Sequence, residues 1–408
     1  MDHKFDLIVI SSYPPKGQIH GKGTVGVAMC AKNTLLSMSR GKNPPKILVL
    51  AEKLINSPQK YREDNVTVKR CWQRNSLSIY YHLLENLLQN PTNKVMIEFE
   101  VAMLGNPLIN VFFPLFILIL RLFGIKITVV IHQVVLNFSE ISGHIGQKKD
   151  SPKNNLLSLL AHVFYRLVVL FSNQTIVFEQ FLKNRLGIND PKIKIVPLGV
   201  ENYKFQKPKN NKTFTITVFG FLAWYKGTDW IVEKISRYLD RHPKANLNLI
   251  IAGGPNPNHI DKPHYQQFLS KINRLSGKHP QNITITGFVP EDKIKEYYLS
   301  SDLIVLPYRV GMSSSGPLSL AFSYHTPFLI SEKIALSLDT FDFKQSLEQF
   351  SISPRQVTFK LNSKDFLNKL ELLGKNPKLL NQISLVSRDM SQKRDWAEIG
   401  KMYKEIVL

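Results

Sequence analysis

Residues 214–227 read FTITVFGFLAWYKG, and this stretch decides the fold class of the chain. The apolar, β-branched run from Phe214 to Phe219 predicts a buried strand, and Gly220 ends it. A helical pattern follows, because one face of the next segment carries Trp230, Ile231, Ile235, Tyr238 and Leu239. Lys226 therefore stands between the carboxyl end of a strand and the start of a helix, where open α/β sheets bind ligands and a cation can meet a phosphate. The alternative is an exposed lysine that only follows a strand.

A second site of the same kind follows further along the chain. Residues 302–307 (DLIVLP) predict another buried strand, and Arg309 comes soon after it. Favoured N-cap residues and a first-turn proline then predict a helix start, in the run Ser313, Ser314, Ser315, Gly316, Pro317 and Leu318. Free backbone N–H groups and the helix dipole would bind an anion there, and Arg309 with Lys226 would add two charges suited to a diphosphate. The alternatives are serines that only cap the helix and an arginine that braces a neighbouring carboxylate.

Apolar strands alternate with helical stretches along the whole chain, which favours an α/β protein with parallel, doubly wound sheets. The polar stretch 201–212 is the best candidate for a linker between two domains, and the chain is long enough for two cores. We expect strands near residues 5–11, 47–51, 95–99, 127–132, 175–178, 193–197, 214–219, 247–252, 283–286, 303–306 and 328–330.

Four motifs in order resemble the C-terminal half of glycosyltransferase family 4. They are the Lys-Gly pair in Tyr225-Lys226-Gly227, the turn Gly253-Gly254-Pro255, the turn Gly287-Phe288-Val289, and a Leu306-Pro307 strand end followed by Thr326-Pro327. The resemblance implies the GT-B fold, in which two Rossmann-like domains face a cleft. It also implies an enzyme that transfers a sugar from a nucleotide diphosphate-sugar with retention of configuration.

The resemblance reaches the N-terminal half more faintly. The strand at residues 6–11 is followed by a loop rich in glycine, and the strand 127–132 ends in His132, as beside the donor sugar in that family. Residues 394–403 resemble the last helix, which crosses back to the first domain. We therefore expect an acceptor domain at 1–203, a donor domain at 210–385 and a returning helix at 386–408.

Site residues follow from the motifs and from the resemblance. The donor would be held by Gly220, Lys226, Gly253, Gly254, Phe288, Arg309, Ser313, Ser314, Ser315, Gly316, Pro317 and Leu318. The catalytic residues would be His132, Lys226 and Arg309, and the acceptor or its closing loop would involve Gly21, Lys22, Gly23, Glu98 and Glu100. Each has a plainer alternative: a core histidine, a connecting loop, a half-exposed strand end, or packing for Phe288.

Two departures from the family pattern bear on activity. The usual pair of glutamates on the loop before the late helix is replaced by Met312 and Leu320, and the usual basic residue after the first glycine is Phe221. These changes favour a second hypothesis, a GT-B protein that binds a nucleotide-sugar or acts as a scaffold without transfer.

The charge and the apolar segments of the chain limit the kinds of binding partner that we expect. The formal charge of +22 indicates either an anionic partner or lysine-rich faces that are only solvated. No nucleic-acid-binding motif accompanies the charge, so we expect no nucleic acid. Two apolar runs, 108–120 and 156–171, are either core helices or helices that dock on an anionic membrane surface. Two cysteines and a polar N-terminus indicate a cytoplasmic protein, either free or peripheral on the inner face of the plasma membrane.

The expected chemistry uses no metal and no cofactor beyond the donor substrate. The sequence has no Asp-x-Asp motif, so leaving-group charge would be stabilised by the cations and the helix dipole. The acceptor would be a saccharide or a lipid-linked molecule, and cell-envelope polysaccharide or glycolipid assembly is the expected setting.

Overall fold

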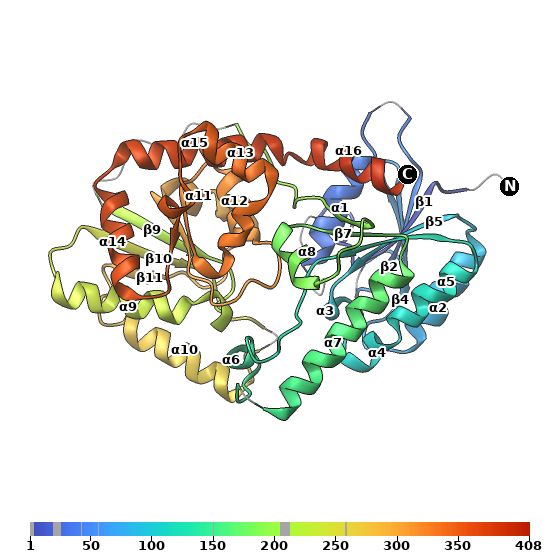
Figure 1. Cartoon of the computed structure of the whole chain (residues 1–408), viewed down its shortest axis with the longest axis horizontal. Helices are drawn as coiled ribbons and strands as arrows, with labels where there is room; N and C mark the ends of the chain where they lie inside the picture. Colours follow the sequence, from blue (N-terminus) through green and yellow to red (C-terminus); the bar gives the residue numbers. More distant parts are fainter. Residues whose placement is uncertain are drawn as a thin grey trace.

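β9 (Phe214–Phe219), the strand of the opening stretch, lies inside a six-stranded parallel sheet of order β11-β10-β9-β12-β13-β14. Its other strands are β10 (Leu247–Ala252), β11 (Ile283–Ile285), β12 (Leu303–Leu306), β13 (Phe328–Ser331) and β14 (Thr358–Phe359). The computed structural model describes residues 4–18, 26–41, 43–55, 57–149, 151–204, 213–257 and 259–408. Figure 1 shows this sheet in one domain and a second sheet in the other.

The sheet of the first domain has eight strands in the order β3-β4-β2-β1-β5-β6-β7-β8. All neighbours are parallel except β3 and β4, which form an antiparallel hairpin at one edge. The strands are β1 (Leu7–Ile10), β2 (Ile47–Glu52), β3 (Lys60–Glu63), β4 (Val66–Trp72), β5 (Lys94–Phe99), β6 (Lys126–Ile131), β7 (Gln174–Val177) and β8 (Ile193–Ile195).

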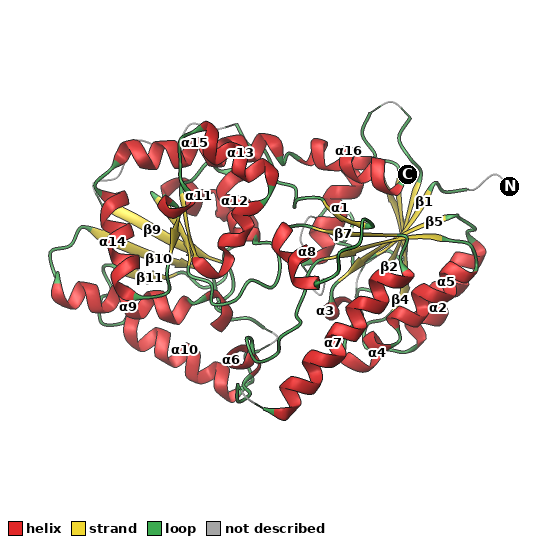
Figure 2. Ribbon diagram, viewed as in Figure 1, coloured by secondary structure: helices red, strands yellow, loops and turns green. Residues whose placement is uncertain are grey.

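Helices cover both sheets, as Figure 2 shows. In the first domain they are α1 (Val27–Met38), α2 (Ser78–Gln89), α3 (Val101–Leu104), α4 (Pro107–Val111), α5 (Phe113–Leu122), α6 (Ser142–Ile145), α7 (Pro152–Phe171) and α8 (Gln180–Leu186). The second part of the chain contributes η1 (Trp224–Lys226), α9 (Thr228–Arg241), α10 (Pro263–Ser276), α11 (Glu291–Ser300), α12 (Gly316–Ser323), η2 (Glu332–Asp339), α13 (Phe341–Gln349), η3 (Pro354–Gln356), α14 (Ser363–Gly374), α15 (Pro377–Lys393) and α16 (Trp396–Val407).

The prediction of a two-domain α/β fold with parallel sheets is confirmed, and every strand expected from the sequence is present. Three strands were not expected: β3, β4 and β14. β4 carries Lys69 and Arg70 in mid-strand, which breaks the apolar pattern. Arg70 is nevertheless buried, because it donates hydrogen bonds to the carbonyl oxygens of Glu52, Tyr13 and Pro14.

The end of the chain crosses between two hydrophobic cores. α15 contributes Val386 and Met390 to the core of the second domain. α16 contributes Trp396 and Tyr403 to the core of the first, and it packs beside α1 (Figure 1). The crossing therefore begins near Arg394 in the structure.

The carboxyl edges of the two sheets meet. After β6, Gln133 forms a β-bridge with Ser313, and the N–H of Val134 donates to the carbonyl of Met312 at 3.0 Å. An apolar cluster of Ile141, Val310 and Met312 lies at this contact. The loops that follow parallel strands in both domains thus come together, which is where α/β sheets place ligand sites.

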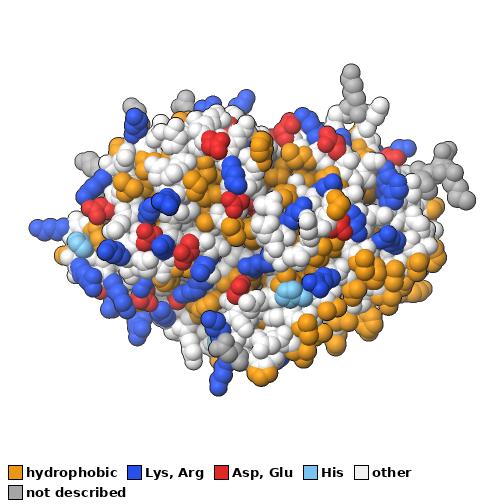
Figure 3. All heavy atoms as spheres, viewed as in Figure 1, with side chains coloured by type: hydrophobic (Ala, Val, Ile, Leu, Met, Phe, Trp, Pro, Cys, Tyr) orange, Lys and Arg blue, Asp and Glu red, His pale blue; other side chains and the backbone are white. Residues whose placement is uncertain are grey.

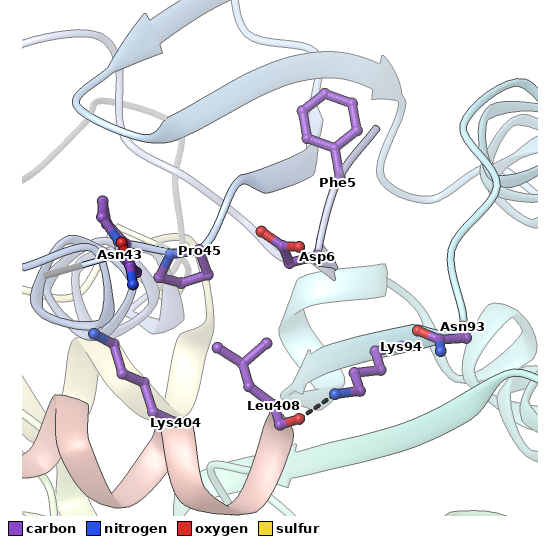
Figure 4. Close-up of a pocket in the computed structure, with 9 residues that line it drawn as sticks. Phe5, Asp6, Asn43, Pro45, Asn93, Lys94, Lys404 and Leu408 are labelled. Atoms are coloured by element: carbon purple, nitrogen blue, oxygen red, sulfur yellow. Dashed lines mark hydrogen bonds between the residues drawn. The ribbon is translucent and has the colours of Figure 1, made fainter. Parts of the chain in front are cut away.

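A cavity of about 730 Å³ lies at the opposite, amino edge of the first sheet (Figure 4). Its lining includes Asp6 before β1, Lys94 at the start of β5, and the chain end at Leu408, whose carbonyl accepts a hydrogen bond from Lys94. Because this cavity is far from the carboxyl edges, we place the candidate site at the domain contact and not here.

Candidate active site

The turn after β9 holds Lys226 at the carboxyl edge of the second sheet. Two glycines make the turn possible: Gly220 has φ +105°, and Gly227 has φ +72°. A β-carbon at Gly227 would lie 1.9 Å from the carbonyl oxygen of Pro307, so only glycine allows the turn to pack against the end of β12. Packing therefore requires Gly227 of the Lys-Gly pair.

Lys226 presents a half-buried ammonium at this edge. A β-carbon on Gly220 would lie 2.6 Å from Lys226 Nζ and 3.8 Å from Pro317 Cγ, so the ammonium, Gly220 and the first turn of α12 meet. Within the described ranges, the ammonium makes no ion pair or hydrogen bond, and burial lowers its pKa to about 8. An anion bound there would supply the missing counter-charge.

The start of α12 is capped as the sequence predicts. Ser315 is the N-cap, and its hydroxyl oxygen accepts a hydrogen bond from the N–H of Leu318 at 3.3 Å. The Ser315 hydroxyl also lies 3.2 Å from the Tyr308 hydroxyl. Ser313 and Ser314 instead contact the first domain, through the bridge to Gln133 and through a hydrogen bond from Ser314 Oγ to Glu179 Oε1 at 3.2 Å.

Arg309 is engaged by the protein itself. Its Nη1 and Nη2 lie 2.7 and 3.0 Å from the two carboxylate oxygens of Asp229, and Nη1 also donates to the carbonyl of Trp224 at 2.6 Å. The guanidinium carbon stacks 4.9 Å from the Trp224 ring centre. The structure thus shows the bracing alternative, and contact of Arg309 with a diphosphate stays a prediction.

The glycines after β10 bring neighbouring loops close together. A β-carbon on Gly253 would lie 2.0 Å from the Gly220 carbonyl oxygen, and one on Gly254 would lie 2.8 Å from the backbone nitrogen of Phe288. Phe288 itself is 73% exposed, and Phe221 is 41% exposed. Two exposed aromatic rings at a ligand-binding edge suit a nucleobase or ribose, and this assignment stays a prediction.

His132 of the first domain lies against a buried glutamate. His132 Nε2 lies 2.6 Å from Glu98 Oε2, and the His132 ring meets Phe178 edge-on with centres 4.8 Å apart. Glu98 is fully buried and its carboxylate holds His132, and its contact with acceptor hydroxyls stays a prediction. Glu100 follows the strand end, where burial raises its pKa. Gly21, Lys22 and Gly23 lie outside the described residues.

Sequence reasoning missed a charged cluster between the domains. Glu179, at the start of α8, is buried and lies 3.6 Å from Arg394 of the crossing segment. Arg394 also pairs with Asp342 at 2.6 Å and donates to Thr340. Burial raises the pKa of Glu179 to about 7. No local sequence pattern predicts this cluster, because its members come from distant parts of the chain.

The residue in place of the first family glutamate, Met312, is 6% exposed and belongs to the interdomain apolar cluster. Leu320 packs against the core of the second domain. Both positions therefore serve packing in this chain. In the part of the chain that the structure describes, no group of three acidic, histidine or cysteine residues could hold a metal ion.

Comparison with known families gives a partial match. Residues 213–337, which contain β9, Lys226, Arg309 and the start of α12, match the family described as glycosyl transferases group 1. The similarity to this family therefore lies within the second domain. No curated protein sequence matches the chain.

Solved structures are similar over nearly the whole chain. A sucrose-phosphate synthase from Thermosynechococcus elongatus aligns with a TM-score of 0.71 at 12% identity, over 99% of this chain and 98% of that one. Trehalose-6-phosphate synthase OtsA aligns with a TM-score of 0.69 at 12% identity, over 98% of both chains. Anabaena HepE in complex with UDP aligns with a TM-score of 0.62 at 12% identity, over 98% of both. At these identities the likeness establishes the GT-B fold.

Proposed function

We propose that the protein is a retaining glycosyltransferase that moves a sugar from a UDP-sugar to a saccharide or lipid-linked acceptor, in cell-envelope polysaccharide or glycolipid assembly. The observation that carries the proposal is the half-buried ammonium of Lys226 beside the first turn of α12, without a counter-charge in the described structure. A diphosphate fits this place, because the cation and the backbone N–H groups of the helix start both favour it.

Solved relatives support the choice of nucleotide. HepE is described in complex with UDP, and a trehalose-6-phosphate synthase from E. coli is described bound with UDP-2-fluoro glucose. We infer that the diphosphate of the donor lies between Lys226 and residues 315–318, with the base near Phe288.

The proposed chemistry needs no metal and no cofactor other than the donor. Lys226 and the dipole of α12 would stabilise the charge that develops on the leaving diphosphate. A phosphate oxygen of the donor would accept the proton of the acceptor hydroxyl, so no protein base is required. His132, held by Glu98, would face the donor sugar from the first domain. We place the protein in the cytoplasm, at the inner face of the plasma membrane.

A thermal-shift screen tests the proposal. Wild type, Lys226→Ala and the control Lys244→Ala, an exposed lysine of the second domain, are each heated with UDP, GDP, ADP and their common sugars. A ligand at 100 times its Kd stabilises the folded state by about 2.7 kcal/mol. We expect stabilisation by UDP in wild type and in Lys244→Ala and none in Lys226→Ala. Stabilisation of all three proteins alike would remove Lys226 from the donor site.

The replacement of both family glutamates by Met312 and Leu320 favours a second candidate, a nucleotide-sugar-binding protein without transfer. Release of UDP from a UDP-sugar in the presence of acceptor separates the two. UDP binding without any turnover over a broad set of acceptors would favour the binding protein.

A further inference from the structure

The first domain exposes a broad apolar surface that the fold does not use. Figure 3 shows hydrophobic side chains gathered where α4, α5 and α7 lie in Figure 1. We name this surface the α4–α5–α7 face. Its exposed members are Leu108, Val111, Phe112, Leu115, Leu122, Phe123, Leu156, Leu159, Leu160, Val163 and Leu170.

The face belongs to helices that are already fixed on the domain by their other side. α7 buries Tyr165, Val168 and Val169 against the first core. α5 packs beside α7, and Arg121 Nη1 at its end donates to the carbonyl of Leu170 at 2.9 Å. The outward leucines are therefore held in place in rows. Large apolar patches on a soluble domain mark a surface for a partner or a membrane.

The charged residues within helices α4, α5 and α7 have one sign. Residues 101–139 and 151–178 contain no Asp or Glu, and their charged residues are Arg121, Lys126, Lys153 and Arg166. In the sequence, Lys148, Lys149 and Asp150 precede α7, which leaves this flank with a net positive charge. An apolar face with basic residues beside it complements acyl chains under anionic headgroups.

By length and composition, α7 could cross a membrane: it has 20 residues, and only 22% of its most apolar window is buried. Its inner side argues for a different placement. The Tyr165 hydroxyl donates to the carbonyl of Gln133 at 2.8 Å, and Asn154 is fully buried. A spanning α7 would break these contacts, so the helix fits a position in the plane of the interface.

We propose that the α4–α5–α7 face docks on an anionic lipid bilayer, with α7 lying in the headgroup region. The inner side of α7, opposite the docking face, contacts the segment that leads to the candidate active site. Tyr165 holds Gln133, which pairs with Ser313 at the donor loop, and Ser158 of α7 accepts a hydrogen bond from the N–H of Phe138 at 3.0 Å. Docking in this orientation would present a lipid-linked acceptor to the contact between the domains. This last step rests on the proposed function, whereas membrane binding itself does not.

Co-sedimentation with vesicles tests the proposal. Full-length protein is mixed with vesicles of phosphatidylcholine alone or with 30% phosphatidylglycerol, at low and high salt. We expect binding to the anionic vesicles that falls on addition of salt. Leu159→Asn/Leu160→Asn should weaken binding at least about tenfold by removing buried apolar surface. Lys153→Gln/Arg166→Gln should weaken it by about 30-fold, since each basic residue near the surface contributes about 1 kcal/mol.

A matched control uses exposed apolar residues of the second domain, Leu336→Asn/Leu372→Asn, which should bind vesicles as wild type does. All variants should keep the UDP thermal shift. Vesicle binding therefore reports on the α4–α5–α7 face, and the thermal shift reports on the donor site. The proposal is overturned if wild type stays in the supernatant with anionic vesicles. It is also overturned if the Leu159/Leu160 variant binds like its control, or if light scattering shows a wild-type dimer that this variant converts to monomer.

Discussion

The guanidinium of Arg309 and the carboxylate of Asp229 form a two-pronged pair, with N–O distances of 2.7 and 3.0 Å. Asp229 lies in the first turn of α9, and Arg309 follows β12. The same guanidinium donates to the carbonyl of Trp224, the first residue of the 3₁₀ turn that ends at Lys226. The pair therefore fixes the turn that carries Lys226 to the neighbouring strand end, which gives Arg309 a positioning role beside its predicted contact with the diphosphate.

Arg309→Lys should keep the positive charge but lose the bidentate interaction with Asp229, because a lysine ammonium cannot make both parallel hydrogen bonds. We expect a loss of unfolding free energy on the order of 2 kcal/mol and a raised KM for the donor. Asp229→Asn should behave similarly, and the double variant should show coupling of about 0.5–3 kcal/mol. Denaturation and donor kinetics measure both effects.

The matched control for this pair is Arg237→Lys, since Arg237 pairs with Glu233 but is 66% exposed. Its cost should stay below about 0.5 kcal/mol. Additive effects of Arg309→Lys and Asp229→Asn would contradict the assigned role.

Glu179 should make stability depend on pH. Burial raises its pKa to about 7, whereas the unfolded chain has an ordinary value near 4.5. Between these values the folded state keeps a proton that the unfolded state lacks, so this contribution is full below pH 4.5 and is lost as pH rises through 7. Glu179→Gln keeps a partner for Ser314, and Arg394 keeps Asp342.

We therefore expect the melting temperature of Glu179→Gln relative to wild type to rise between pH 5 and pH 8. Thermal unfolding at four pH values measures the difference. A difference that does not change with pH would mean that Glu179 is ionised and paired throughout. Glu398→Gln, at a half-exposed glutamate of α16, supplies the control.

The features that the sequence predicted are local ones. The strand at residues 214–219, the turn glycines and the Ser315 cap depend on neighbours within a few residues, so pattern and turn chemistry suffice. The missed features join distant residues: Arg309 and Asp229 are 80 positions apart, and Ser314 and Glu179 are 135 apart. β4 was missed for the same reason, because buried Arg70 is satisfied by carbonyl groups of other segments.

Met312→Glu tests whether the site would bind UDP better with the family glutamate, or whether packing at position 312 now requires an apolar side chain. Met312 is buried in a cluster with Val310 and with Ile141 of the other domain, so a carboxylate there would lose its hydration. We expect a clear loss of thermal stability and no tighter UDP binding. Met312→Leu conserves volume and should cost less than about 1.5 kcal/mol.

Tighter UDP binding by Met312→Glu with unchanged stability would contradict this expectation. It would show that a glutamate fits at position 312 and that the wild-type site binds UDP less well without it. That outcome would favour the binding protein without transfer over the enzyme.

Lys226 should limit activity at alkaline pH. Burial lowers its pKa to about 8, so the free protein loses the charge that we propose binds the donor as pH rises above that value. We expect kcat/KM for the donor to fall on an alkaline limb near pH 8. Lys226→Arg stays charged over this range and should remove the limb even if its overall rate is lower.

Stability gives a second, independent readout of the same lysine. The folded-state pKa of about 8 lies below the ordinary 10.5, so wild type gains stability as pH rises through this window and loses it as pH falls through 8. Lys226→Met should thus be more stable than wild type at pH 7, by about 1–3 kcal/mol, while losing at least about 100-fold in kcat/KM. Chemical denaturation at pH 7 and pH 10 measures the first quantity. A variant that is less stable at pH 7 would show that the ammonium already has a counter-charge, and the diphosphate assignment would lose its main support.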